Sequence, residues 1–185
     1  AVPENCGFVA SVFSDETWIY DDACNGWTQI EGDGPGGRAR AAAAYDGESM
    51  WVFGGRWRAG TSGNYTIYDE LWRFEVATRT WSQIRPNSQD VPPGRVNHAM
   101  TYDASRNRLW IFGGNRSTSG LQVSLLNDVW YFDIGAMTWH RLATQGEAPT
   151  PRLFVTLFHD ATRDQLITFG GADETLFNND ARYFD

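Results

Sequence analysis

Few residues of this 185-residue chain are suited to nucleophilic or metal chemistry. Its three histidines, His98, His140 and His159, fall in separate segments, and no two show a spacing typical of metal ligands. Neither a G-x-S-x-G motif nor a phosphate-binding glycine loop occurs. We therefore expect no catalytic residue, no metal site and no cofactor, and we interpret His98 as a histidine of an inner strand.

The two cysteines, Cys6 and Cys24, indicate structural chemistry. In an oxidising compartment they would form a disulfide worth about 3 kcal/mol through the loop that it closes. Acceptor sequons at Asn64 and Asn115 predict glycosylation in the same compartment. The chain also starts with Ala-Val-Pro, as after removal of a signal peptide. We expect a secreted or cell-surface protein; the alternative is a cytosolic one with two reduced, buried cysteines.

One segment is rich in the residue types that dominate protein interfaces. Arg56, Trp57 and Arg58 open it, and Tyr65 and Tyr68 close it. Arginine beside tryptophan or tyrosine is the composition of binding hot spots, and exposed aromatic rings also stack on sugars. We predict that these five residues take part in binding; the alternative for Trp57 is that it packs against its own loop.

The candidate binding residues lie within a sequence unit that is repeated along the chain, and this unit must position them. Apolar runs ending in a glycine pair occur at 50–55, 109–114 and 166–171, and the pairs lie 59 and 57 residues apart. Such a period indicates one supersecondary unit copied along the chain. Each copy begins with an arginine in a turn (Arg38, Arg95, Arg152), followed by an aspartate (Asp46, Asp103, Asp160). Because they recur, we predict that the arginines bond loop carbonyls or an acid and that the aspartates bond the backbone of tight turns.

Each copy predicts four short strands. After each glycine pair come a variable loop and an aromatic segment, and in two copies a last segment led by Trp81 or Trp139 follows. The stretch before residue 36 matches this second half, with Trp18 and Trp27 at the corresponding positions. The segments are rich in aromatic and β-branched residues and bounded by Gly, Pro, Asn and Asp. No segment shows a helical period, so the sequence predicts an all-β fold.

The order of apolar run, Gly-Gly, aromatic strand and tryptophan-led strand resembles the kelch repeat over residues 15–185. The resemblance implies a kelch-type β-propeller, whose blades are four-stranded antiparallel sheets arranged radially. It further implies that positions two after the recurrent arginines look into the central channel, which makes Arg40 and Asn97 candidates for ligand contact. Some secreted kelch propellers are copper radical oxidases or sialic-acid epimerases, but the Tyr–Cys crosslink and paired histidines of the oxidases have no counterpart in this sequence.

Counting strands gives an incomplete ring of about three blades. We expect a partial blade over 1–35, blades over 36–92 and 93–149, and an incomplete blade over 150–185. Propellers usually need four to eight blades. The remaining blades come either from the same longer chain, which we favour, or from a second copy.

Composition restricts the partners. The net charge is −8 without an acidic block, which argues against nucleic acid. All fifteen basic residues are arginine, so lysine Schiff-base chemistry is excluded for this sequence. No apolar stretch reaches the 18 residues of a membrane span.

Topology predicts which side of the blades binds. In an antiparallel meander, the connections from second to third strand and those between blades share one side. They are the long segments here, at 56–69, 115–127, 172–179, 31–37, 85–94 and 143–151. We call this side the long-loop face and predict an extracellular, non-enzymatic module that binds or scaffolds a protein partner through it, with a glycan as a further candidate. The alternative is part of the catalytic domain of a secreted carbohydrate-active or oxidase-type enzyme; a cytosolic adaptor is a lesser possibility.

Overall fold

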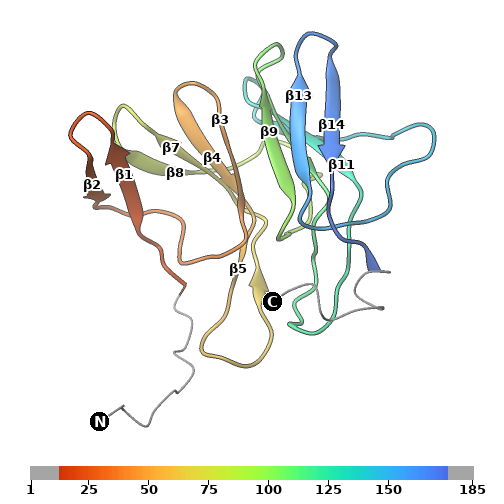
Figure 1. Cartoon of the computed structure of the whole chain (residues 1–185), viewed down its shortest axis with the longest axis horizontal. Coiled ribbons are helices and arrows are strands. Elements are labelled where there is room, and N and C mark those ends of the chain that lie inside the picture. Colours follow the sequence, from red (N-terminus) through yellow and green to blue (C-terminus); the bar gives the residue numbers. More distant parts are fainter. Residues whose placement is uncertain (1–12, 175–185) are drawn as a thin grey trace.

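A computed structural model describes residues 13–174, which form antiparallel sheets (Figure 1). The first four-stranded sheet, the first blade, orders β3 (Ala42–Tyr45), β4 (Ser49–Phe53), β7 (Leu71–Glu75) and β8 (Thr80–Ile84). The second blade orders β9 (Ala99–Asp103), β10 (Arg108–Phe112), β11 (Val129–Asp133) and β12 (Thr138–Arg141). The predicted all-β fold with four-stranded antiparallel blades is confirmed.

Three two-stranded sheets complete the described fold. The hairpin of β1 (Thr17–Asp21) and β2 (Gly26–Ile30) lies at one end of the array, and that of β13 (Thr156–Asp160) and β14 (Gln165–Phe169) lies at the other (Figure 1). A third hairpin joins β5 (Arg56–Trp57) to β6 (Thr66–Ile67) inside the first long loop. The sequence did not predict it, because strands of two residues are too short to show an alternating pattern.

The blades are arranged radially around their first strands. β9 lies between β3 and β13, whereas the tryptophan-led strands β8 and β12 are outermost in their sheets. Backbone bonds join successive copies at the same point: the amide of Gly55 donates to the Arg95 carbonyl at 3.0 Å, and that of Gly114 donates to the Arg152 carbonyl at 2.7 Å. Residues 13–174 therefore form an open arc of a propeller.

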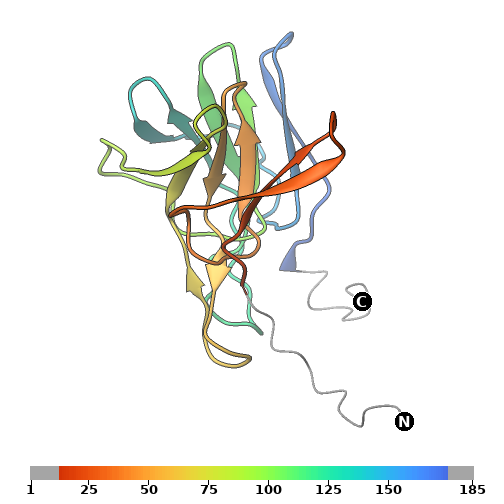
Figure 2. The same cartoon turned by 90° about the vertical axis from the view of Figure 1, so that its left-hand side faces the viewer.

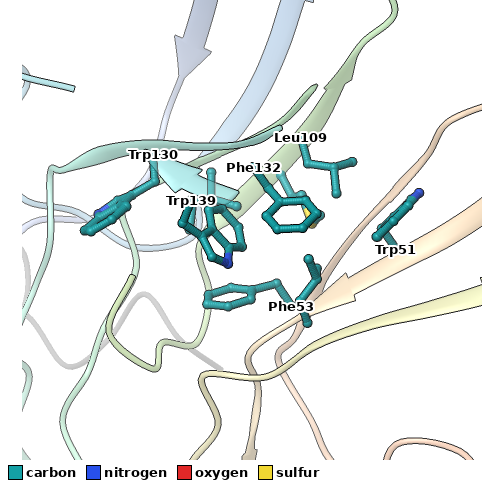
Figure 3. Close-up of a cluster of buried hydrophobic side chains, with 9 residues drawn as sticks. Trp51, Phe53, Leu109, Trp130, Phe132 and Trp139 are labelled. Atoms are coloured by element: carbon teal, nitrogen blue, oxygen red, sulfur yellow. The ribbon is translucent and has the colours of Figure 1, made fainter. Parts of the chain in front are cut away.

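The main core fills the space between the two complete blades (Figure 3). Trp51 and Phe53 of the first blade face Phe132 and Trp139 of the second, with ring centroids 6.1 Å apart for Trp51–Phe132 and 5.2 Å for Phe53–Trp139. Phe132 and Trp139 also contact each other at 5.1 Å. Burial of these large rings is the main apolar contribution to blade stacking.

The glycine pairs of the two complete blades allow this close approach. Gly54 and Gly55 have φ values of 72° and 99°, a region that favours glycine. A Cβ added to Gly54 would lie 2.4 Å from the backbone oxygen of Arg95 in the second blade. The pair thus ends the second strand and admits the next copy.

The predicted disulfide is not supported. Cys24 is an exposed free thiol whose Sγ lies 3.8 Å from the backbone oxygen of Asp21, and Cys6 lies outside the described residues. Cys24 occupies the turn between β1 and β2, where its side chain meets solvent instead of a core.

Replacing Trp139 by alanine should lower the free energy of unfolding by about 3–5 kcal/mol, because the side chain is 3% exposed and stacks on rings of both blades. Trp81, the equivalent residue of the first blade, is only half-buried, so Trp81→Ala should cost less. Urea unfolding of both variants measures the difference. An equal or reversed order would contradict the position of Trp139 in the core between the blades.

Candidate binding face

The long loops gather on one side of the array. The β5–β6 hairpin and the loop from β10 to β11 lie opposite the tight turns that join β3 to β4, β9 to β10 and β13 to β14 (Figure 1). Figure 2 shows the β5–β6 hairpin projecting beyond the sheets on this side. The long-loop face is thus formed by loops held on a sheet scaffold.

Four of the predicted binding residues surround one pocket on this face. Arg40, Arg56, Arg58 and Tyr65 line a cavity of about 250 Å³. The bridge between Ala39 and Arg56 brings the start of β5 beside the segment that carries Arg40. The remaining lining residues were not foreseen, because they are small or lie far away in sequence: Phe13, Ala39, Gly60 and Thr61.

Tyr65 organises the pocket. The guanidinium carbon of Arg56 lies 3.8 Å from the centroid of its ring, and that of Arg58 lies 4.4 Å from it. The backbone amide of Tyr65 donates to the Thr118 carbonyl at 2.8 Å, which ties the hairpin to the β10–β11 loop. Cation–π contacts of this kind hold both arginines without neutralising them.

The three arginines form a positive cluster in an acidic chain. Within residues 13–174, no carboxylate lies within ion-pair distance of Arg40, Arg56 or Arg58. Burial, and then the charges of Arg40 and Arg58, lower the pKa of Arg56. Its Nε is buried and has no hydrogen-bond partner in the described part of the chain. Such an arrangement attracts an anionic group.

The other predicted residues lie outside the pocket. The Tyr68 ring stacks on the guanidinium of Arg38 at 4.2 Å, a contact within the scaffold. Trp57 is 39% exposed and does not line the cavity. The backbone amide of Asn97 donates to the Arg40 carbonyl at 3.0 Å, so the two candidate channel residues adjoin through their backbones.

The recurrent arginines have the predicted structural role. Arg95 is fully buried; its guanidinium donates to the Gly113 carbonyl at 3.0 Å and to both oxygens of Asp128 at 2.8 and 2.9 Å. Arg38 makes the equivalent bonds to the Gly54 carbonyl and Glu70. The recurrent aspartates accept backbone bonds in their tight turns, as predicted.

The asparagines of the two sequons differ in exposure. Asn64 is exposed, and its glycosylation stays a prediction. Asn115 is 7% exposed, and its Oδ1 accepts bonds from the amides of Ser117 and Ser124. The side chain closes its own loop, which gives a glycan on Asn115 no support; its glycosylation stays a prediction.

The three histidines lie in different surroundings. His98 is buried with its ring 5.6 Å from Phe53, and His140 is exposed and stacks on Tyr131 at 4.7 Å. His159 is buried, with its two ring nitrogens each 3.5 Å from a carboxylate oxygen, of Asp103 and Asp164. Among the described residues, no three His, Cys, Asp or Glu side chains form a group that could hold a metal ion. No helix of this part is long and apolar enough to cross a membrane.

Radially stacked four-stranded sheets, each closed by a glycine pair and an outer tryptophan strand, define a propeller-type repeat protein. Residues 59–185 match the family described as the KLHDC2/KLHL20/DRC7 Kelch-repeats domain. The chain belongs to this kelch-repeat family.

The chain is similar to segments of several longer curated proteins. The chain is 35% identical over 106 residues to dynein regulatory complex subunit 7 of Chlamydomonas reinhardtii, which is 57% of this chain and 8% of that protein. It is 30% identical over 169 residues to kelch domain-containing protein 3 of Rattus norvegicus, which is 88% of this chain and 42% of that protein. Acyl-CoA-binding domain-containing protein 5 of Arabidopsis thaliana is 29% identical over 136 residues, or 72% of this chain and 19% of that protein. The chain thus spans less than half the length of these relatives.

Stability should fall in acid because of His98. Burial, and then the charge of Arg95, lower its pKa to about 3, whereas a histidine of the unfolded chain titrates near 6.5. Between pH 3 and pH 6.5, therefore, His98 is protonated in the unfolded chain and neutral in the folded chain. The stability due to neutral His98 is therefore complete above pH 6.5 and falls by about 1.4 kcal/mol for each pH unit below it.

Urea unfolding at several pH values measures this effect. The pH slope of the free energy of unfolding between pH 6.5 and 5 should be weaker by that amount in His98→Leu than in the wild type. Identical slopes in the wild type and His98→Leu would show that His98 does not contribute.

Proposed function

We propose that this chain is a binding module that holds a protein partner through the long-loop face. In this proposal an acidic side chain of the partner enters the pocket of Arg40, Arg56 and Arg58. The observation that carries it is the convergence of three arginines, none paired with a carboxylate of the described residues, around one cavity. Charge-assisted bonds from guanidinium to carboxylate are among the stronger polar contacts.

The pocket also has the composition of an interface centre. Tyr65 adds an aromatic wall, and the cavity of about 250 Å³ is of a size to take one side chain. Membership of the kelch family supports a rigid scaffold, but function depends on the site and not on the fold. The names of the relatives concern much longer proteins, so their partners are not transferred to this chain.

The proposal includes a secreted or cell-surface location, which is supported by the exposed glycosylation sequon at Asn64. Its exposed position in the β5–β6 loop allows a glycan, while the free thiol of Cys24 and the buried Asn115 give this location no support. Expression through a secretory pathway, followed by glycosidase treatment, tests it: a mass shift in the wild type that is lost in Asn64→Gln supports the location, and no shift argues against it.

Replacing Arg56 and Arg58 together by glutamine should weaken binding of an acidic peptide at least ten-fold without lowering the melting temperature. The probe is a fluorescent peptide of alternating Glu and Gly, measured by fluorescence anisotropy at several salt concentrations, with its Gln-for-Glu counterpart beside it. Binding should weaken as salt rises, because dissolved ions screen the attraction between the peptide's carboxylates and the arginines.

Arg79→Gln is the control for loss of a positive charge outside the pocket, since Arg79 lies in the exposed turn between β7 and β8 and does not line the cavity. Equal binding of the two peptides, or equal loss in the Arg79 variant, would contradict the assigned site. A lower melting temperature of the double variant would mean that the arginines are structural.

A further inference from the structure

The pocket on the long-loop face holds more positive charge than one carboxylate can balance. Arg40, Arg56 and Arg58 all line it, and a guanidinium is charged throughout the working pH range and carries five N–H donors. Within residues 13–174, Arg58 donates one hydrogen bond, to the Gly63 carbonyl at 3.4 Å, and the buried Nε of Arg56 has no partner. A carboxylate brings one negative charge and two acceptor oxygens. It would leave two of the three positive charges without a counterion in the pocket.

The donors reach the cavity from two separate segments. Arg40 lies just before β3, whereas Arg56 lies in β5 and Arg58 follows it. Both segments are held by backbone bonds: the amide of Asn97 donates to the Arg40 carbonyl at 3.0 Å, and the amide of Arg56 donates to the Ala39 carbonyl at 2.9 Å. Donors that converge from two sides suit an anion with acceptor oxygens in several directions better than a flat carboxylate.

The aromatic wall of the pocket leaves these donors available. The guanidinium carbons of Arg56 and Arg58 lie 3.8 and 4.4 Å from the centroid of the Tyr65 ring. A cation–π contact of this kind uses no N–H group in a hydrogen bond to an oxygen. The ring of Phe13 meets that of Tyr65 edge to face, with centroids 6.4 Å apart. The two rings thus form an apolar wall beside the arginines.

The size of the cavity and the charge of the chain restrict the kind of anion. The cavity of about 250 Å³ lies below the roughly 300–1,000 Å³ of pockets that enclose a whole small-molecule ligand. It therefore suits one side chain better than a nucleotide. The net charge of −8 opposes approach to a strongly anionic membrane surface. The fitting ligand is a single, short, highly charged side chain of a protein.

We propose that this ligand is the phosphoryl group of a phosphorylated serine or threonine side chain of the partner, an inference that rests on the proposed function and names the group that the pocket holds. A phosphomonoester carries about −1.5 to −2 charges at pH 7 and three strong acceptor oxygens. It balances most of the charge of the three arginines and offers each guanidinium an oxygen. Arginine clusters are a recurring means of recognising phosphorylated segments. Arg40 supplies the third guanidinium, which a carboxylate does not require.

Fluorescence anisotropy with three labelled peptides tests the proposal at pH 7.5. The peptides share the sequence Gly-Gly-X-Gly-Gly, in which X is phosphoserine, glutamate or serine. We expect phosphoserine to bind at least ten-fold more tightly than glutamate, and serine not to bind measurably. Equal affinity for phosphoserine and glutamate would overturn this inference and leave the proposed function intact. Absence of binding by both charged peptides would overturn the proposed function as well.

Variants of Arg40 separate the two kinds of anion. Arg40→Gln should weaken binding of phosphoserine at least ten-fold and binding of glutamate at most three-fold. Arg40→Lys should recover part of the loss, because it keeps the charge without the planar fork of donors. Arg85→Gln is the matched control, since Arg85 is exposed in the 85–94 connection of the same face and does not line the cavity. An equal loss for both peptides in Arg40→Gln, or the same loss in Arg85→Gln, would contradict the assignment.

The pH dependence gives a readout that needs no variant. A phosphomonoester takes its second negative charge with a pKa near 6, whereas glutamate is ionised above about pH 5. Between pH 5.5 and 7.5 the affinity for phosphoserine relative to glutamate should therefore rise about four-fold. The ratio removes effects of the protein's own titrating groups that act on both peptides alike. A ratio that stays constant would overturn the proposal.

Two further measurements identify the source of the anion. Inorganic phosphate should displace the phosphoserine peptide only at concentrations at least ten-fold above that of unlabelled peptide, and equal potency would assign the pocket to a free anion instead. Glu4, the one acidic residue before position 13, lies outside the described residues. Glu4→Gln should leave the affinity for phosphoserine unchanged. A ten-fold rise would show that the chain itself competes for the pocket, and would overturn the assignment to a partner.

Discussion

The buried ion pair between Arg95 and Asp128 is the constraint on which the blade architecture depends. A guanidinium without solvent contact is costly unless every donor finds a partner, and Arg95 finds the Pro93 and Gly113 carbonyls as well as both oxygens of Asp128. Burial acts to raise the pKa of Asp128, but the bonds and charge of Arg95 outweigh it and keep the carboxylate ionised. Asp128 also accepts a bond from the indole of Trp130. The network therefore fixes the start of the third strand to the end of the second.

The corresponding network of the first blade explains how the scaffold positions the long-loop face. In the first blade, Arg38 bonds the Gly54 carbonyl and Glu70, and the next residue, Ala39, exchanges backbone bonds with Arg56 at 3.0 and 2.9 Å. The structural arginine therefore determines where β5 begins, and with it the position of Arg56 in the pocket. Loops that carry binding residues gain precision from such attachment to rigid strands.

The sequence predicts the fold well because the repeat is local and occurs several times. Glycine pairs, recurrent arginines and outer tryptophans each keep one geometry in each blade, so their roles follow from type and spacing. The grouping of Arg56, Arg58 and Tyr65 also follows from composition. Trp57 lies outside the pocket because side chains alternate between the two faces of β5, and this alternation is not visible in so short a strand. Phe13 lines the pocket through a tertiary contact, which the sequence does not predict. The burial of the Asn115 side chain could not be predicted from its sequon, because it depends on bonds from the amides of Ser117 and Ser124 that close the loop.

The unpaired arginines carry a stability cost that a ligand would remove. Burial, and then repulsion from Arg40 and Arg58, lower the pKa of Arg56, so the pocket is less favourable when empty than when it holds an anion. An anionic group that binds only the folded chain shifts the unfolding equilibrium by mass action. The chain has a net charge of −8, so it has many carboxylates elsewhere. One substitution that placed a carboxylate beside the cluster would neutralise part of its charge. Such a change would stabilise the fold but would weaken the proposed site. In the proposed function, the cluster is a site in which local stability and binding are in opposition.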